Sequence, residues 1–266
     1  DYPGVAHAKL PLLRLLFSHF RREHLARNTA RAASFRAFVA ERGEPLRRHA
    51  LYDAIDEQMR AQDGSRYWGW PVWPDELRDP AGAGAMAFEA ANAEAVEYYA
   101  WLQWLADEQL GAAQRLAREL GMAIGLYGDY AVGVNPSGAE TWSDQALYRK
   151  GAGVGAPPDA LALKGQDWGI PPQDPNVLVA EQYQPFRHLV AANMRHFGAL
   201  RLDHVMALFR QWWVPVGLGA TDGGYVHYPL DDLMSVLALE SERHACLVVG
   251  EDLGTVPPEM SHAMAE

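Results

Sequence analysis

Two short apolar segments in the second half of the chain each end in a carboxylate, and this feature constrains the fold more than any other. Residues 198–204 read GALRLDH and residues 246–252 read CLVVGED. Short apolar runs of this kind are typical of buried strands in a parallel sheet. Because parallel barrels carry their reactive groups at the C-terminal ends of the strands, we expect Asp203 and Glu251 to face each other at the mouth of such a barrel.

The first part of the chain is predicted to be helical. Apolar side chains recur at steps of three and four residues over 5–62 and over 86–120, which is the period of an amphipathic helix. We expect Gly43-Glu44-Pro45 to interrupt the first stretch. Between the two stretches stand three tryptophans, Trp68, Trp70 and Trp73. A small apolar cluster that pins a loop is the simpler interpretation, and a sugar-stacking platform is the alternative.

From residue 121 the chain alternates strand and helix patterns. Strands are predicted over 123–127, 198–202 and 246–250, and helices over 177–197 and 231–244. This alternation predicts an α/β fold with a parallel sheet, which we interpret as part of a (β/α)8 TIM-type barrel. We therefore expect a helical subdomain over 1–120, inserted in or packed on a partial catalytic barrel over 121–266. The Gly- and Pro-rich segment 133–173 is predicted to be a long binding loop of that barrel.

Composition excludes several classes of partner. The net charge of −11 disfavours nucleic acid and anionic membranes, which both attract basic surfaces, and no apolar run approaches the length of a membrane span. The single cysteine, Cys246, forms no intramolecular disulfide, which favours a reducing compartment such as the cytoplasm. The chain begins with Asp1 and ends inside a helical pattern that starts at Pro257, so we expect an internal piece of a longer protein.

Paired carboxylates at neighbouring strand ends are suited to the cleavage of a glycosidic bond. A retaining enzyme needs one carboxylate as nucleophile and one carboxylic acid, about 5–5.5 Å apart. Arg201 lies two residues before Asp203, so both point to the same face of a strand, and the guanidinium keeps Asp203 ionised as a nucleophile requires. Glu251 follows four apolar residues, and we expect this drier setting to favour the acid.

Three other interpretations stay open at this point. Asp203 and Arg201 form a purely structural ion pair in the first, and Glu251 with Asp252 caps a following helix in the second. The third is a metal site, whose candidate ligands are Asp203, His204, His227, Glu251 and Asp252. No close pair of histidines or cysteines accompanies these residues, so we predict no metal.

Four motifs, in this order along the chain, resemble one known family. They are GDYAVGV (128–134), GQDWG (165–169), RLDHVM (201–206) and GEDLG (250–254), and they are similar to the bacterial 4-alpha-glucanotransferases, or amylomaltases, of the alpha-amylase clan. The resemblance implies retaining transfer of an alpha-1,4-glucan segment to the 4-hydroxyl of glucose or of another glucan, through a covalent glycosyl-enzyme. It implies maltooligosaccharides and other alpha-1,4-glucans as partners, and no cofactor.

The same resemblance implies roles for individual residues. Asp203 matches the nucleophile and Glu251 the general acid/base. The matched substrate-binding residues are Arg201, Asp129, Trp168, His204 and Asp252. The family has a third catalytic aspartate, which no residue of this chain matches. Two alternatives therefore remain for this chain, an alpha-glucan hydrolase and a non-catalytic glucan-binding fragment.

Overall fold

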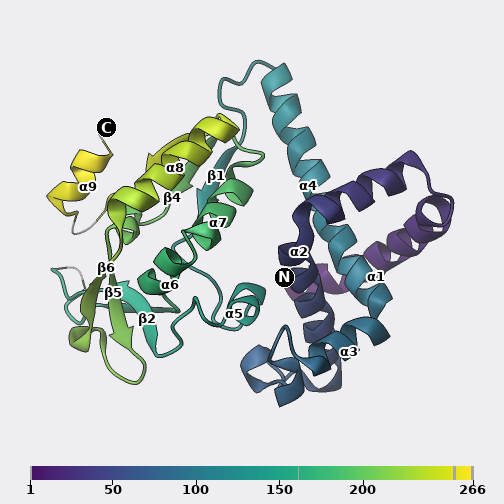
Figure 1. The fold of residues 1–266 in the computed structure, drawn as a ribbon, viewed down its shortest axis with the longest axis horizontal. Coiled ribbons are helices and arrows are strands. Elements are labelled where there is room, and N and C mark those ends of the chain that lie inside the picture. The colour runs from purple at the N-terminus through teal and green to yellow at the C-terminus, as the bar shows by residue number, and fades with distance from the viewer. Residues whose placement is uncertain (1, 161, 254–255, 265–266) are drawn as a thin grey trace. The chain divides into compact units, whose positions relative to one another are not determined.

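The structure, a computed structural model, describes residues 2–160, 162–253 and 256–264. The chain divides into two compact units, Asp1–Gln109 and Leu110–Glu266. The first unit is helical, and the second combines helices with two β-sheets (Figure 1). The fold is therefore α/β, as predicted. No helix in the described part of the chain has the length and apolar character that crossing a membrane requires.

Helices α1 to α3 and the first part of α4 make up the first unit. They are α1 (Tyr2–Phe20), the π-helical turn η1 (Arg21–Leu25), α2 (Ala30–Asp63), α3 (Ala83–Ala91) and α4 (Ala93–Glu119), with the 3-10 turns η2 (Trp70–Val72) and η3 (Asp75–Leu77). Helix α2 kinks at Gly43, whose φ of 55° is not helical, so the predicted interruption is confirmed. The stretch 86–120 is helical as predicted, but it is divided into α3 and α4 at Asn92. The Asn92 side chain donates to the Phe88 carbonyl at 2.9 Å and competes with a continuous helical backbone.

Helix α4 begins in the first unit and ends in the second. The predicted boundary at residue 120 lies just after the end of this helix at Glu119, whereas the two compact units divide after Gln109. The division into a helical subdomain and a catalytic barrel stays a prediction.

Aromatic side chains form the core of the first unit. The rings of Phe20 and Phe35 lie 5.7 Å apart in an edge-to-face contact. Trp70 and Trp73 are 3% and 0% exposed, whereas Trp68 is 50% exposed. Two of the three neighbouring tryptophans are therefore core residues, in accordance with the simpler interpretation of this segment.

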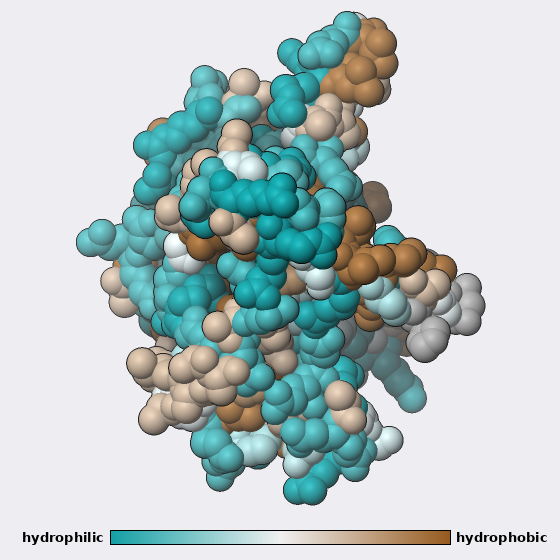
Figure 2. All heavy atoms as spheres, turned by 90° about the vertical axis from the view of Figure 1, so that its right-hand side faces the viewer, coloured by the Kyte–Doolittle hydropathy of each residue, from teal (hydrophilic) through white to brown (hydrophobic). Residues whose placement is uncertain are grey.

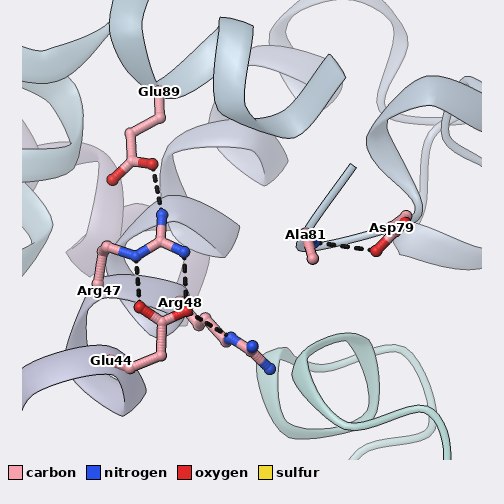
Figure 3. A network of polar contacts seen from close by, with 6 residues as sticks. All are labelled: Glu44, Arg47, Arg48, Asp79, Ala81 and Glu89. Carbon is pink, nitrogen blue, oxygen red and sulfur yellow. Dashed lines mark hydrogen bonds and ion pairs between the residues drawn. The ribbon is translucent and has the colours of Figure 1, made fainter. Parts of the chain in front are cut away.

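Arginines of the first unit pair with acidic side chains. Figure 2 shows mostly hydrophilic residues on one face of the molecule, with hydrophobic residues gathered in separate patches. In one such network, Glu44 accepts from Nε and Nη2 of Arg47 at 2.6 and 2.8 Å and from Nε of Arg48 at 2.8 Å (Figure 3). Arg47 also pairs with Glu89 of α3. The hydrogen bond from Arg47 lowers the pKa of Glu44 to about 2.

A three-stranded parallel sheet organises the second unit. Its strands, in spatial order, are β1 (Tyr127–Tyr130), β4 (Ala199–Leu202) and β7 (Leu247–Gly250). Helix α7 (Gln184–Met194) precedes β4, and helix α8 (Leu230–His244) precedes β7. Both helices pack over the sheet (Figure 1), where Val190, Leu200 and Leu233 belong to one buried cluster. The predicted alternation of strands and helices is therefore confirmed in this unit.

The strand predicted over 123–127 is wrong in its bounds, because β1 begins at Tyr127. The side chain of Gln114 accounts for the difference. Its Nε2 donates to the Ile124 carbonyl at 3.2 Å, and its Oε1 accepts from the Leu126 N–H at 2.6 Å. These backbone groups would pair with another strand if the sheet began earlier.

The helix predicted over 177–197 is divided into α6 (Pro175–Ala180) and α7. Gln182 and Tyr183 adopt left-handed φ values of 53° and 60° between them, which no α-helix contains. The helix predicted over 231–244 corresponds to α8. A final helix, α9 (Pro258–Ala263), follows Pro257 as predicted.

The segment 133–173, predicted to be a long loop, contains regular structure. It holds helix α5 (Ala139–Ser143) and the strands β2 (Ala152–Ala156) and β3 (Gln166–Ile170). With β5 (Arg210–Pro215) and β6 (Gly224–His227) these strands form an antiparallel sheet in the order β3-β2-β5-β6. The prediction was wrong because β2 reads AGVGA, which lacks the branched and aromatic side chains that usually indicate a strand. A binding role for this segment stays a prediction.

Candidate active site

Arg201 stands at the centre of the candidate site because of the strand register. In the parallel ladder Asp129 of β1 is the partner of Arg201 of β4, and Asp203 follows two residues later. Arg201 Nη1 donates to Asp129 Oδ1 and Arg201 Nη2 donates to Asp203 Oδ1, each at 2.7 Å. The contact between Arg201 and Asp203 that strand alternation predicts is therefore present, and Arg201 joins two carboxylates from neighbouring strands.

Glu251 stands beside Asp203 at the end of the next strand. Leu202 and Gly250 are register partners, so the residues that follow them leave the sheet side by side. Glu251 Oε2 accepts from the His204 N–H at 2.9 Å, and Glu251 Oε1 accepts from the Leu253 N–H at 2.8 Å. These two bonds fix the orientation of the carboxylate, and they use two of its roughly four acceptor positions.

The dry setting predicted for Glu251 is not observed in this chain. Strand β7 is an edge strand of the described sheet, and its Leu247 and Val249 side chains are 58% and 40% exposed. Glu251 itself is half-buried. The prediction assumed that an apolar strand is buried on both faces. The burial of a strand depends instead on which residues pack against it.

His204 connects the two strand ends. Its backbone is left-handed, with φ 52° and ψ 60°, and its ring makes an edge-to-face contact with Trp168 at 5.3 Å. Burial lowers the pKa of the His204 imidazole, although the nearby carboxylates of Glu251 and Asp203 act in the opposite direction. A lowered pKa favours the neutral imidazole, which can donate one hydrogen bond and accept another.

Two cavities adjoin His204. The first has a volume of about 270 Å³, and its polar wall includes Asp129, Asp203 and His204. The second, of about 230 Å³, is also lined by His204 and is bordered by Trp168 and by strands of the antiparallel sheet. Carboxylates in the wall of an otherwise largely apolar cavity suit a polar ligand that has apolar faces, as a sugar ring has.

The remaining predicted site residues are less enclosed. Asp252 follows Glu251 with an exposed side chain. Gly254, the last residue of the fourth motif, lies outside the described residues. His227, one of the candidate metal ligands, packs edge-to-face on Phe209 with ring centroids 5.1 Å apart. Among the described residues no group of three or more His, Cys, Asp or Glu side chains is arranged to hold a metal ion.

Comparison with known proteins agrees with these motifs. The family model described as 4-alpha-glucanotransferase matches residues 1–266. The chain belongs to the 4-alpha-glucanotransferase family. Among its relatives, the 4-alpha-glucanotransferase of Haemophilus influenzae is 44% identical over 268 residues, which cover 100% of this chain and 38% of that protein. The 4-alpha-glucanotransferase of Mycobacterium bovis is 42% identical over 232 residues, which cover 87% of this chain and 31% of that protein.

Solved structures of amylomaltases have a similar fold. The crystal structure of amylomaltase from Corynebacterium glutamicum aligns with a TM-score of 0.80 and 37% identity, over 98% of this chain and 33% of that one. An amylomaltase from Streptococcus agalactiae in complex with acarbose aligns with a TM-score of 0.83 and 20% identity, over 100% of this chain and 52% of that one. The chain thus spans 31% to 38% of the length of the curated relatives named above.

Three residues close to the candidate site of this 4-alpha-glucanotransferase family chain were not predicted from the sequence. Arg210, Trp212 and Tyr225 line the second cavity. The alternation of Arg210 and Trp212 along one strand was the available signal, because both then point to the same face. That signal alone does not identify the cavity wall. Tyr225 reaches the same wall only through the pairing of β5 with β6, which was not predicted.

Proposed function

We propose that the full-length protein that contains this chain is a retaining 4-alpha-glucanotransferase, with Asp203 as nucleophile and Glu251 as general acid/base. The observation that supports this best is the contact of Arg201 with both Asp129 and Asp203, beside Glu251 on the neighbouring strand. A guanidinium that donates to a carboxylate favours its charged form, which a nucleophile needs. Family membership supports the same reaction.

The proposed mechanism has two displacements at one anomeric carbon. A carboxylate oxygen of Asp203 attacks this carbon while Glu251 gives its proton to the glycosidic oxygen, so the C–O bond breaks and the leaving glucan gains a 4-hydroxyl. Glu251 then removes the proton from the 4-hydroxyl of an acceptor, whose oxygen attacks the anomeric carbon and displaces Asp203. Two inversions give net retention of the alpha configuration.

The substrate-binding residues take supporting roles in this proposal. Arg201 orients the nucleophile, and Asp129 accepts hydrogen bonds from the sugar hydroxyls in the first cavity. His204 provides a polar wall for the ring that reacts, Trp168 provides an apolar wall of the adjoining second cavity, and the exposed Asp252 contacts more distant hydroxyls. Maltooligosaccharides and other alpha-1,4-glucans are the proposed substrates.

We also propose that β1, β4 and β7 are successive strands of a (β/α)8 barrel. The parallel order of the three strands and the crossover helices α7 and α8 support this architecture. In this proposal, residues 1–120 form a helical subdomain on that barrel, residues 121–266 contribute three of its strands, and the segment 133–173 contributes to binding. A cytoplasmic location is part of the proposal, because the single cysteine, Cys246, fits a reducing compartment.

The decisive experiment is a product analysis of the full-length protein with maltotriose. Transfer yields glucose together with maltooligosaccharides longer than the substrate. Release of reducing ends without any longer product would identify a hydrolase instead. Binding of maltotriose without turnover would identify a non-catalytic glucan-binding protein.

Two substitutions separate the roles of the two carboxylates. Glu251→Gln is expected to lower turnover of maltotriose by about 10²–10⁴, the usual contribution of a general acid, yet to keep the first step on maltosyl fluoride, whose leaving group needs no proton. Asp203→Asn is expected to abolish turnover of both substrates. Asp231→Asn, an exposed aspartate on α8, is the control. Equal loss on both substrates in Glu251→Gln would remove Glu251 from the acid role.

A further inference from the structure

The turn after helix α4 fixes the direction in which the chain leaves that helix. The chain reverses there and leads back to strand β1 (Figure 1). Gly121 adopts a φ of 88°, and its N–H donates to the Arg118 carbonyl at 3.0 Å. The Met122 N–H donates to the Ala117 carbonyl at 3.1 Å. These two bonds form a Schellman motif, which closes the last turn of a helix and orients the residues that follow.

Two side chains of α4 hold the segment 123–126, which we call the connector. Arg118 donates to the carbonyl of its first residue. Gln114 Nε2 donates to the Ile124 carbonyl at 3.2 Å, and Gln114 Oε1 accepts from the Leu126 N–H at 2.6 Å. Because these two side chains are four residues apart, they lie on the same face of the helix. The connector therefore runs along the last turns of α4.

Glycines make room for the connector on both of its sides. Gly125 inside it has a φ of 77°, and a Cβ atom there would lie 2.3 Å from Gln114 Oε1. A Cβ atom at Gly198, the residue before β4, would lie 1.8 Å from the Ile124 carbonyl oxygen. The Gly198 N–H also donates to the Leu126 carbonyl at 3.0 Å. The connector is thus enclosed between α4 and the start of β4, and a shift along either would break these contacts.

The position of Asp129 depends on the connector. Asp129 lies three residues after Leu126, and its side chain is 65% exposed. Among the described strands, β1 pairs with β4 alone. A slip of β1 by one residue would turn Asp129 to the other face of the sheet. A slip by two residues would place Tyr127 or Ala131 opposite Arg201.

We propose that Gln114 is a positioning residue of the candidate active site, which places Asp129 opposite Arg201 by holding the connector. The inference rests on the proposed function, in which Asp129 binds sugar hydroxyls and Arg201 orients the nucleophile. Gln114 contacts the chain just before β1 begins, whereas Asp129 lies near the other end of that strand. Its effect on the reaction therefore passes through the backbone of β1.

The test is a double-mutant cycle in the full-length protein, with initial rates of maltotriose turnover. Gln114→Ala is expected to lower kcat/KM about tenfold, mainly through kcat, because a misplacement of about 1 Å in a site costs up to about 10²-fold. Asp129→Ala is expected to lower kcat/KM about 10²-fold. In the Asp129→Ala background, Gln114→Ala is expected to change kcat/KM less than about twofold, because the group that Gln114 positions is then absent.

Two further variants separate positioning from folding. Gln109→Ala removes an exposed glutamine from the same helix and is expected to leave kcat/KM unchanged. Gln114→Met keeps the length of the side chain without its hydrogen bonds, so it should behave as Gln114→Ala does, and it carries the cycle if the alanine variant does not fold. Thermal melting checks that each variant is folded. An equal loss from Gln114→Ala in both backgrounds identifies a general structural role and overturns the inference, as does the absence of any loss.

Hydrogen exchange of the same variants gives a readout that needs no turnover. The Asp203 N–H donates to the Tyr130 carbonyl at 3.0 Å, so this amide reports on the end of β1. The amides of 127–130 and of Asp203 are expected to exchange faster in Gln114→Ala than in Gln109→Ala, whereas those of α8 keep their rates.

Two results distinguish this inference from the proposed function. Transfer products from maltotriose, with both turnover and exchange unchanged in Gln114→Ala, overturn the inference alone. Absence of transfer products from the parental protein overturns the proposed function, and unchanged exchange in Gln114→Ala then overturns the inference as well.

Discussion

The buried carboxylate of Glu240 ties helix α8 to helix α7, which pack together over the parallel sheet. Its side chain is 3% exposed, and its Oε1 accepts from Arg187 Nε at 2.9 Å and from Arg243 Nη1 at 2.7 Å. His244 Nδ1 lies 3.6 Å from the other oxygen. Burial alone would raise the pKa of this carboxyl, but the hydrogen bonds from Arg187 and Arg243 more than offset it and hold the pKa below its usual value.

Glu240→Gln tests how much the charge contributes to stability. Both hydrogen bonds end on one oxygen, which the amide oxygen of glutamine replaces, so the substitution removes the charge and keeps the geometry. Both hydrogen bonds keep a charged guanidinium donor in the variant, so the loss is the attraction between the opposite charges alone. The two arginines are 41% and 47% exposed, and a partly exposed ion pair contributes up to about 1 kcal/mol, so the expected loss is about 1–2 kcal/mol.

The assay is urea unfolding of the full-length protein, followed by circular dichroism at pH 7 and in acid. Glu242→Gln removes an exposed charge from the same helix and is the matched control, with an expected change within about 0.5 kcal/mol. Because folding lowers the pKa of Glu240, its contribution is present above the ordinary value of 4.5 and is lost as the pH falls through the lower folded value. Equal losses in the two variants at pH 7, or a difference that persists in acid, would refute the reasoning.

Three further predictions concern the first unit. Because folding lowers the pKa of Glu44, its contribution to folding stability is present above pH 4.5 and is lost as the pH falls toward about 2. The urea midpoints of the parental protein and of Glu44→Gln should therefore converge in that interval. A constant separation of the midpoints would contradict the role of Arg47. Gly43→Ala should cost about 1 kcal/mol in thermal unfolding because the φ of 55° is unfavourable for alanine, although the space around a Cβ is open. Trp73→Ala should cost about 3–5 kcal/mol because Trp73 is fully buried, whereas Trp68→Ala should cost less than about 0.5 kcal/mol, and similar costs would contradict the assignment of these tryptophans.

The parallel sheet was predictable because its signals are local. Strands β4 and β7 are apolar runs that end in polar residues, and their observed bounds lie within one residue of those predicted. The side-by-side position of Asp203 and Glu251 then follows from parallel pairing alone. The contact between Arg201 and Asp129 was not predictable in this way, because it depends on where β1 begins, and the side chain of Gln114 decides that.

The antiparallel sheet was not predictable from the sequence, because contacts between its strands, rather than strand propensity, determine which residues it contains. Strand β2 has glycine at positions 153 and 155, where a Cβ would meet the Asp167 carboxylate at 2.5 Å and the Gln166 carbonyl at 2.0 Å. The close approach of β3 therefore requires the residues that make β2 resemble a loop. Burial patterns and residue propensities in the sequence do not include such contacts between strands. The sequence therefore gave no indication that Trp212 lines a cavity.

The setting of Glu251 illustrates the same limit for chemistry. The place of Glu251 at a strand end follows from the apolar residues before it, whereas the polarity of its surroundings depends on the atoms around it. In this chain the preceding strand, β7, is exposed on its outer edge. A general acid needs a site that stabilises its protonated form. If Glu251 has that role, further protein must cover β7, so the acid activity of Glu251 should require the full-length protein. Measuring maltotriose turnover of the 266-residue chain beside that of the full-length protein tests this requirement, and equal turnover would show that the exposed setting is sufficient.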